Sequence, residues 1–354
     1  MRRIATAVAS LGAEGGTVYV FPGAYSETND ISAVELMAPV SVIGVTGDPA
    51  DVTVSRTATF ARVFKLDNAS ALVRAVTMQG GIVQNEPKEG YTVTEANTPM
   101  NSSNGTAVNG GNLWITANGG VVENCIVKDG QVKRYGKAGG NVYMQGGRLS
   151  RCVVTGGDLV GTHNSAQGDC GTSLLADGGI VESCLFTGTT DNHVAPVCVG
   201  GTAKMINCVV AGNSGTDCGG ILIKGNNSRV VNTVIYGNAA TAEGGNAVYR
   251  ASAMNKNIPA DASAAFVNCA SDGAAINGSC VFVGASAFAD AANGDYAPAS
   301  RESPLVNSGA NYAEAGGVSN LDLAGNPRVW TSTPDIGAFE FQYEVEPCTM
   351  LIFR

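Results

Sequence analysis

The amino-acid sequence predicts an all-β fold in which the chain winds as a parallel β-helix, and a recurring pattern is the first observation behind this prediction. Between residues 111 and 269, a Gly-Gly pair is followed by four residues and then a cysteine in the clearest copies. These copies end at Cys125, Cys152 and Cys184, and looser copies end at Cys208, Thr233 and Cys269. The end points lie 27, 32, 24, 25 and 36 residues apart, and a period of this length is typical of a solenoid.

The content of each repeat indicates the kind of solenoid. Each repeat holds two or three apolar runs rich in Val, Ile and Leu, such as 113–115, 121–122 and 125–127. None of them keeps a 3.6-residue period over ten residues, and short runs between Gly and Asn are typical of strands. A coil of about 25 residues with three short strands is one turn of a parallel β-helix, whose coils stack about 4.8 Å apart.

The turn residues agree with this interpretation. The Gly-Gly pair supplies backbone with positive φ between the first and second runs. Asparagine recurs between the second and third runs, and it tolerates the left-handed region better than most residues. We expect these side chains to stack and to hydrogen-bond from coil to coil, with interruptions at Arg151 and Ser183. The asparagines are Asn124, Asn207, Asn232 and Asn268.

A resemblance to a known superfamily follows from the repeats. The segments "GGN-LWI", "GGN-VYM" and "GG-ILI", followed by "NC-VV-GN", resemble right-handed parallel β-helix proteins of the pectate-lyase-like superfamily over residues 15–285. The resemblance implies a right-handed helix of single strands. It also implies that any activity lies on the first sheet and the loops entering it, where enzymes of this superfamily commonly act.

The two ends of the solenoid need caps. Residues 4–11 are expected to form a short amphipathic helix at the N-terminal end, rather than the apolar core of a signal peptide. The stretch 82–109 and the excursions at 128–138, 157–169 and 187–194 are expected to be loops between coils. We therefore assign residues 1–300 to one β-helix with its N-terminal cap.

The C-terminal part resembles a second group of proteins. Residues 288–311 and 321–342 resemble the end of bacterial surface proteins called choice-of-anchor Q domain proteins. The match includes Gly294-Asp295-Tyr296, Gly325-Asn326-Pro327-Arg328 and 335–340. Residues 301–343 are therefore expected to form an irregular cap packed on the last coil, and 344–354 a tail without a recognisable sorting signal. The resemblance implies a cell-surface or extracellular location, although no signal peptide is evident.

Composition narrows the possible partners. The net charge of −9 argues against a nucleic-acid partner, and no apolar run reaches the length of a membrane span. We expect a monomer. Cysteines of the repeat position should form a column of unpaired thiols, since Cβ atoms stacked about 4.8 Å apart exceed the roughly 3.8 Å of a disulfide. Cys170, Cys198 and Cys218 lie at other positions and could pair.

The distinctive polar residues lie in loops that enter the first sheet. Candidate substrate-binding residues are Lys133, Arg134, Tyr135 and Lys137. Candidate catalytic acids and bases follow on later coils, and the two carboxylates of a hydrolase lie about 5 to 9.5 Å apart. They are His163, Asp169, Asp191, His193 and Asp217. The acidic residues among them could instead hold Ca²⁺, since clustered carboxylates suit this ion.

Three functions remain open at this stage. The leading one is a bacterial surface or secreted protein that binds a polysaccharide or surface glycan along this face. A polysaccharide lyase or glycoside hydrolase acting on the same face is the second, and a passive adhesin-like stalk is the third. Trp114 and Tyr143 occupy matching positions in the first sheet. They would stack on sugar rings if they point outward, and belong to the core if they point inward.

Overall fold

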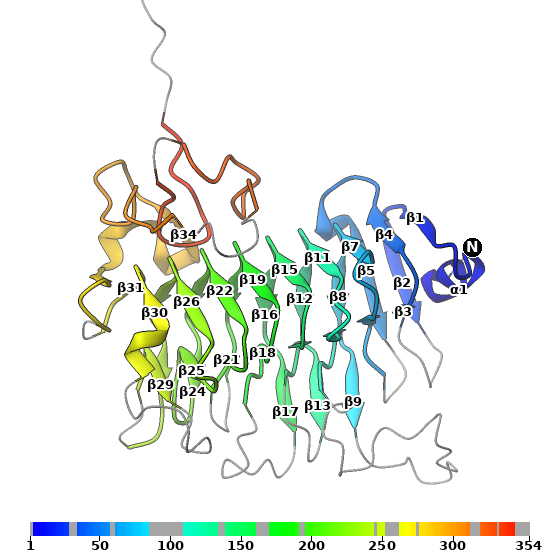
Figure 1. The fold of residues 1–354 in the computed structure, drawn as a ribbon, viewed down its shortest axis with the longest axis horizontal. Coiled ribbons are helices and arrows are strands. Elements are labelled where there is room, and N and C mark those ends of the chain that lie inside the picture. Colours follow the sequence, from blue (N-terminus) through cyan, green and yellow to red (C-terminus); the bar gives the residue numbers. More distant parts are fainter. Residues whose placement is uncertain are drawn as a thin grey trace, which may run out of the picture.

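The computed structural model shows the predicted right-handed parallel β-helix (Figure 1). The structure describes residues 3–27, 34–56, 61–84, 109–133, 139–160, 170–190, 195–243, 246–251, 262–273, 276–311, 319–330 and 333–343. Three long parallel sheets run along the axis, because each coil contributes one strand to each of them. This arrangement confirms the fold class predicted from the repeats.

The first sheet has eight strands, and the chain then passes to a nine-stranded sheet and a ten-stranded sheet. The eight-stranded sheet consists of β3 (Val34–Leu36), β6 (Phe64–Leu66), β10 (Leu113–Ile115), β14 (Val142–Met144), β18 (Leu174–Ala176), β21 (Val197–Val199), β25 (Ile221–Ile223) and β29 (Tyr249–Ala251). The nine-stranded sheet consists of β1 (Gly16–Val20), β4 (Val40–Gly44), β7 (Leu72–Arg74), β11 (Val121–Glu123), β15 (Arg148–Ser150), β19 (Ile180–Glu182), β22 (Lys204–Ile206), β26 (Arg229–Val231) and β30 (Phe266–Val267). The ten-stranded sheet consists of β2 (Gly23–Glu27), β5 (Val52–Arg56), β8 (Thr77–Gln79), β12 (Ile126–Lys128), β16 (Val153–Thr155), β20 (Leu185–Thr187), β23 (Val209–Ala211), β27 (Val234–Tyr236), β31 (Ala270–Ser271) and β32 (Val281–Phe282).

Part of the sequence expected to be loop forms further strands. A three-stranded parallel sheet, β9 (Ile82–Gln84), β13 (Gln131–Lys133) and β17 (Asp158–Val160), follows the ten-stranded sheet in its coils. Two short strands, β24 (Ser214–Gly215) and β28 (Ala239–Ala240), pair in later coils. The expectation of loops at 82–84, 131–133 and 158–160 was therefore wrong. Residues 85–108, the remainder of the long predicted loop except Asn109, lie outside the described residues.

The interior confirms the predicted column. Cys125, Cys152, Cys184, Cys208, Thr233 and Cys269 are all buried at one position of successive coils, and the cysteines belong to the main apolar core. The backbone N–H of Cys152 lies 3.4 Å from Cys184 Sγ, and that of Cys208 lies 3.4 Å from Thr233 Oγ1. The five cysteines of this column are free thiols. Thiols therefore serve here as small apolar side chains.

The residue before this column turns the corner between two sheets in a left-handed conformation. Asn124, Arg151, Ser183, Asn207, Asn232 and Asn268 have φ between 48° and 51°. Among the described residues, one direct side-chain bond joins these asparagines, from Asn232 Nδ2 to Asn207 Oδ1 at 3.4 Å. Most of these asparagine side chains instead bind the C-terminal part of the chain. The prediction of the turn conformation is confirmed, and the prediction of a coil-to-coil ladder holds for that one pair.

Stronger ladders occur at two other corners. Asn112 Nδ2 donates to Asn141 Oδ1 at 2.8 Å, where each coil enters the eight-stranded sheet. At the exit from the ten-stranded sheet, Asn213 Nδ2 donates to Asn238 Oδ1 at 3.1 Å. Thr189 N–H continues this second ladder by donating to Asn213 Oδ1 at 3.1 Å. Buried polar side chains of this kind require partners, so the coil-to-coil bonds help to fix the stacking register.

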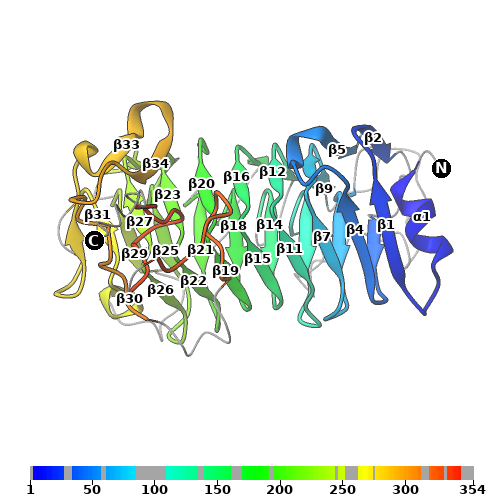
Figure 2. The same cartoon turned by 90° about the horizontal axis from the view of Figure 1, so that it is seen from above.

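The N-terminal end carries the predicted helical cap. Helix α1 (Ile4–Ser10) places Ile4 and Val8 in the main core beyond the first coil (Figures 1 and 2). The carboxylate of Glu27, at the end of β2, accepts a hydrogen bond from Ile4 N–H at 2.7 Å. The helix is thereby attached to the first coil at its N-terminus, where unsatisfied backbone donors occur.

The C-terminal part folds back along the solenoid rather than over its last coil alone. The described residues from 283 onward, 283–311, 319–330 and 333–343, include the antiparallel pair β33 (Phe288–Asp290) and β34 (Asp295–Pro298) and lie beside the coils that carry β19 to β31 (Figures 1 and 2). Leu185, Val209 and Val234 face outward from the ten-stranded sheet and are buried in one apolar cluster with Phe288 and Ile336. The expected packing on the last coil therefore extends to earlier coils.

Candidate functional site

The structure describes only some of the predicted site residues. Trp114, Tyr143 and Asp217 are described, and Lys133 is the last residue of β13. Asp217 is half-buried and precedes β25, four strands from β10 along the eight-stranded sheet, which corresponds to roughly 19 Å. The remaining predicted residues lie outside the described residues. They are Arg134, Tyr135, Lys137, His163, Asp169, Asp191 and His193.

Trp114 and Tyr143 both point away from the interior of the solenoid. Leu113 and Ile115, which flank Trp114 in β10, are fully buried in the main core, so the middle residue of the strand faces outward. Trp114 is the register partner of Tyr143, and their ring centroids lie 6.4 Å apart. The outward alternative left open by the sequence is therefore correct.

A second layer covers part of this outward row. Val83, Val132 and Leu159, from β9, β13 and β17, form a separate apolar cluster with Tyr143. Tyr143 is only 2% exposed, whereas Trp114 is half-buried at the margin of the cluster. Trp114 therefore presents part of its ring to the surface, and Tyr143 does not.

A row of polar side chains follows directly after the strands that carry these aromatics. Trp114 Nε1 donates to Gln145 Oε1 at 3.1 Å, and the Tyr143 hydroxyl donates to Asp177 Oδ2 at 3.2 Å. Asp67 accepts hydrogen bonds from the Thr116 hydroxyl and from Asn118 Nδ2. Since these residues end successive strands, the row has the spacing of the sheet, about 4.8 Å per coil.

Two cations approach the indole of Trp114. Arg62 Cζ lies 4.8 Å and Lys65 Nζ 5.2 Å from the ring centroid, within the range of cation–π attraction. The guanidinium of Arg62 also donates to the backbone oxygens of Asn109 and Gly110. Lys65 Nζ lies 3.6 Å from Asp67 Oδ2. The aromatic ring is thus fixed between positive charge and the polar row.

The electrostatics set the charge state of the site at neutral pH. Burial lowers the pKa of Arg62 to about 10, so its guanidinium stays protonated. Partial burial acts to raise the pKa of Asp67, but hydrogen bonds from Thr116 and Asn118 and the charge of Lys65 together hold it below its ordinary value. Burial and the charge of Asp177 raise the pKa of Tyr143. Its hydroxyl is therefore a hydrogen-bond donor at neutral pH.

The two carboxylates of the described row lie further apart than the catalytic pair of a glycoside hydrolase. Asp67 and Asp177 follow β6 and β18, which are three strands apart, or roughly 14 Å. Paired carboxylates of glycoside hydrolases lie about 5 to 9.5 Å apart. Within the described ranges, His, Cys, Asp and Glu side chains form no group of three or more that could hold a metal ion. The predicted Ca²⁺ ligands Asp169 and Asp191 lie outside those ranges.

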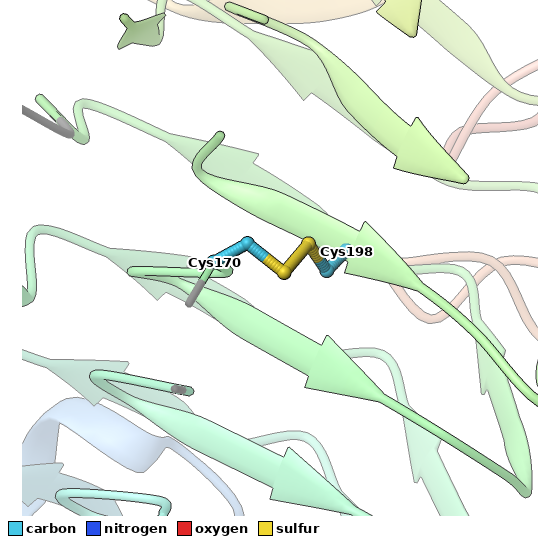
Figure 3. The surroundings of a disulfide bond; sticks show 2 residues. All are labelled: Cys170 and Cys198. Atoms are coloured by element: carbon cyan, nitrogen blue, oxygen red, sulfur yellow. A yellow bond between two sulfur atoms is a disulfide. The ribbon is translucent and has the colours of Figure 1, made fainter. Parts of the chain in front are cut away.

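A disulfide lies further along the same outward row. Cys170, just before β18, is bonded to Cys198 of the neighbouring strand β21, with Cα atoms 6.2 Å apart (Figure 3). Cys198 is in register with Leu175, whose own register partner is Tyr143. Of the three cysteines that could pair, Cys170 and Cys198 do so, and Cys218 is buried in the same apolar cluster outside the bond. The bond ties the entry of one coil to the next.

The sequence contained a signal for this row that the prediction overlooked. In four strands, an apolar–x–apolar triplet is followed by a polar residue: Asp67 after β6, Thr116 after β10, Gln145 after β14 and Asp177 after β18. Reading the triplets as inward–outward–inward would also have assigned Lys65 and Trp114 to one outer face. Arg62 lies before its strand and carries no such signal.

Comparison with known proteins gives one structural likeness. A solved structure of a pectin methylesterase mutant in complex with a hexasaccharide aligns with a TM-score of 0.39 and 10% sequence identity. The alignment covers 84% of this chain and 94% of that one. Neither the models of protein families nor the curated proteins gave a match. The fold assignment therefore rests on the strand topology. Among the described residues, no helix is long and apolar enough to span a membrane.

Proposed function

We propose that the protein binds a polysaccharide across the outer face of the eight-stranded sheet, over Trp114. The observation that carries this proposal is the indole held at the surface by Gln145, with Arg62 and Lys65 within about 5 Å of its ring. An aromatic face packs against the C–H face of a sugar ring, while the polar row offers hydrogen bonds at each coil. A polymer that crosses the coils would meet the indole at one coil and the polar row at the neighbouring coils.

An acidic polysaccharide suits the site best. The cationic side chains of Lys65 and Arg62 lie on a protein with a net charge of −9. A local positive group attracts an anionic ligand even when the overall charge is negative. Lys133 at the end of β13, and the predicted substrate-binding residues Arg134, Tyr135 and Lys137 after it, precede β14 of the same sheet. We propose that they contribute to the same binding face.

We also propose that the protein acts outside the bacterial cytoplasm, at the cell surface or secreted. The disulfide between Cys170 and Cys198 supports this location, because such bonds persist mainly in oxidising compartments. The resemblance of residues 288–342 to choice-of-anchor Q domain proteins supports it from the sequence.

Gel electrophoresis through immobilised polysaccharides tests the proposal. Lys65→Gln and Trp114→Phe should each weaken retention on an acidic polysaccharide by about fivefold in apparent Kd, the size expected for one partly exposed cation–π or charge-assisted contact. Arg301→Gln is the matched control, because Arg301 is 72% exposed and distant in sequence, in the C-terminal part. Equal retention of all variants and the parent protein would place the binding face elsewhere. Release of reducing ends in the same samples would favour the lyase or hydrolase alternative.

A further inference from the structure

A buried arginine, Arg328, is one of the links between the C-terminal segment and the solenoid. The Arg328 guanidinium donates to the backbone oxygens of Gly337 at 3.1 Å and Ala338 at 2.6 Å within the segment. It also donates to the hydroxyl of Ser183, at the corner after β19, at 3.0 Å. Arg328 is 4% exposed. This side chain therefore links the fold of the segment to its position on the coil.

Three buried carboxylates surround this arginine. Asp322, Asp335 and Glu340 are at most 4% exposed, and Glu340 Oε2 lies 3.7 Å from Arg328 Nη1. Each carboxylate accepts backbone N–H groups of the segment: Asp322 from Glu340 at 2.9 Å, Glu340 from Asp335 at 3.0 Å, and Asp335 from Phe341 at 2.6 Å. The segment is therefore folded around its own acidic side chains.

The charges in this cluster do not balance when all three carboxylates are ionised. Arg328 contributes one positive charge against three negative charges from Asp322, Asp335 and Glu340. On the solenoid side, the buried thiol of Cys208 is near enough to act electrostatically on Arg328. Glu182, also on the solenoid, accepts a hydrogen bond from Ser319 N–H and forms an ion pair with Arg148 at 2.7 Å. Burial of unbalanced like charges is costly, and protonation of one carboxyl lowers this cost by reducing the net charge of the cluster from −2 to −1.

Glu340 is the carboxyl best placed to carry the proton. Its Oε1 accepts from Trp330 N–H at 3.3 Å, a longer bond than those to either oxygen of Asp335, which are 2.6 and 2.7 Å. Burial and the charge of Asp335 raise the pKa of Glu340 from 4.5 to about 7. Burial also raises the pKa of Asp335. Both groups therefore hold protons more tightly in the docked segment than in solvent.

We propose that residues 319–330 and 333–343 form a pH-sensitive clasp, which closes on the corner of the solenoid when Glu340 is protonated and loosens when Glu340 ionises. Loosening uncovers Ser183, Asn207 and Asn232, whose side chains contact this segment or residues just before it. It also uncovers the part of the ten-stranded sheet that packs against Ile336 and Ala338.

The direction follows from proton linkage. The docked form has the higher carboxyl pKa, so it binds more protons than the undocked form between the two pKa values. Docking is therefore strongest at or below pH 4.5 and weakens as pH rises through about 7. With a pKa of 4.5 for Glu340 in the undocked form and about 7 in the docked form, the equilibrium constant for docking falls by about 50- to 100-fold between pH 5 and pH 8.

Hydrogen–deuterium exchange of the full chain tests the clasp. After correction for intrinsic exchange rates, protection of the amides in 319–330 and 333–343 should fall by up to this factor between pH 5 and pH 8. Protection of strands β10 to β18 should remain unchanged. Glu340→Gln, which keeps the shape without the titrating group, should remove most of the pH dependence, whereas Glu302→Gln, at a 73% exposed side chain, should leave it intact.

A second measurement does not depend on the folding of the Glu340 variant. The chain contains two tryptophans, so Trp114→Phe leaves Trp330, on the segment, as the only tryptophan. Trp330 is 39% exposed, and its emission should move to longer wavelength as pH rises through about 7. Protection and emission that stay constant from pH 5 to pH 8, or that show tighter docking at high pH, would overturn the proposal.

Discussion

The interior column of the solenoid and the outward row of its eight-stranded sheet run across the same coils but obey different constraints. The column from Cys125 to Cys269 contains cysteine in every described coil except the one with Thr233. The outward row changes character at each step, through Lys65, Trp114, Tyr143, Leu175, Cys198 and Leu222. Stacking inside a closed coil demands similar small side chains, whereas the outer face can vary and so can carry recognition.

The largest expected effect comes from placing a charge in the interior column. Cys184 is fully buried, so Cys184→Asp introduces an unpaired charge without space or partner. We expect a loss of more than about 4 kcal/mol in the free energy of unfolding, or failure to fold. Lys65→Gln, on the outward row of the same solenoid, removes one ion pair with Asp67 and should cost less than about 1 kcal/mol. Urea unfolding compares the two, and similar losses would contradict the distinction between column and row.

Removal of the C-terminal segment should have the next largest effect. Deletion of residues 321–354 takes Ile336 and Ala338 from the apolar cluster that covers Leu185, Val209 and Val234. The bared strip on the ten-stranded sheet should promote association, because contiguous exposed apolar surface favours it. Light scattering coupled to size exclusion measures the mass. A monomeric truncated protein with an unchanged melting temperature would show that the segment does not protect this face.

A small gain in stability is expected from one substitution at the corner where strands of the ten-stranded sheet end. Glycine recurs there with φ of 62° to 70°, at Gly80, Gly156, Gly188, Gly212 and Gly237, but Asp129 occupies one place with φ of 58°. Asp129→Gly should stabilise the protein by about 0.5 kcal/mol, since glycine adopts this conformation without steric cost. Gly212→Ala should destabilise it by about 1 kcal/mol. Differential scanning calorimetry measures the change in melting temperature of each variant. A change in the same direction for both variants would contradict the explanation from backbone conformation.

The sequence predicts the repeating parts of this molecule far better than its individual ones. Period, strand content and left-handed corners recur, so each copy supports the others, and the column through Cys184 is correctly placed. The direction of Trp114 is not determined, because a three-residue strand in which Leu113, Trp114 and Ile115 are all apolar shows no alternation. Contacts such as Arg328 to Ser183 join residues 145 positions apart, and no local pattern indicates them.

Titration of Trp114 fluorescence with polysaccharides tests the central claim most directly. The variant Trp330→Phe retains Trp114 as its only tryptophan, on the proposed binding face. We expect an acidic polysaccharide to change the intensity and wavelength of its emission in a saturable manner, with the midpoint moved about fivefold by Lys65→Gln. Binding of the polysaccharide detected independently, with no change in Trp114 emission at saturation, would contradict the assignment of this face.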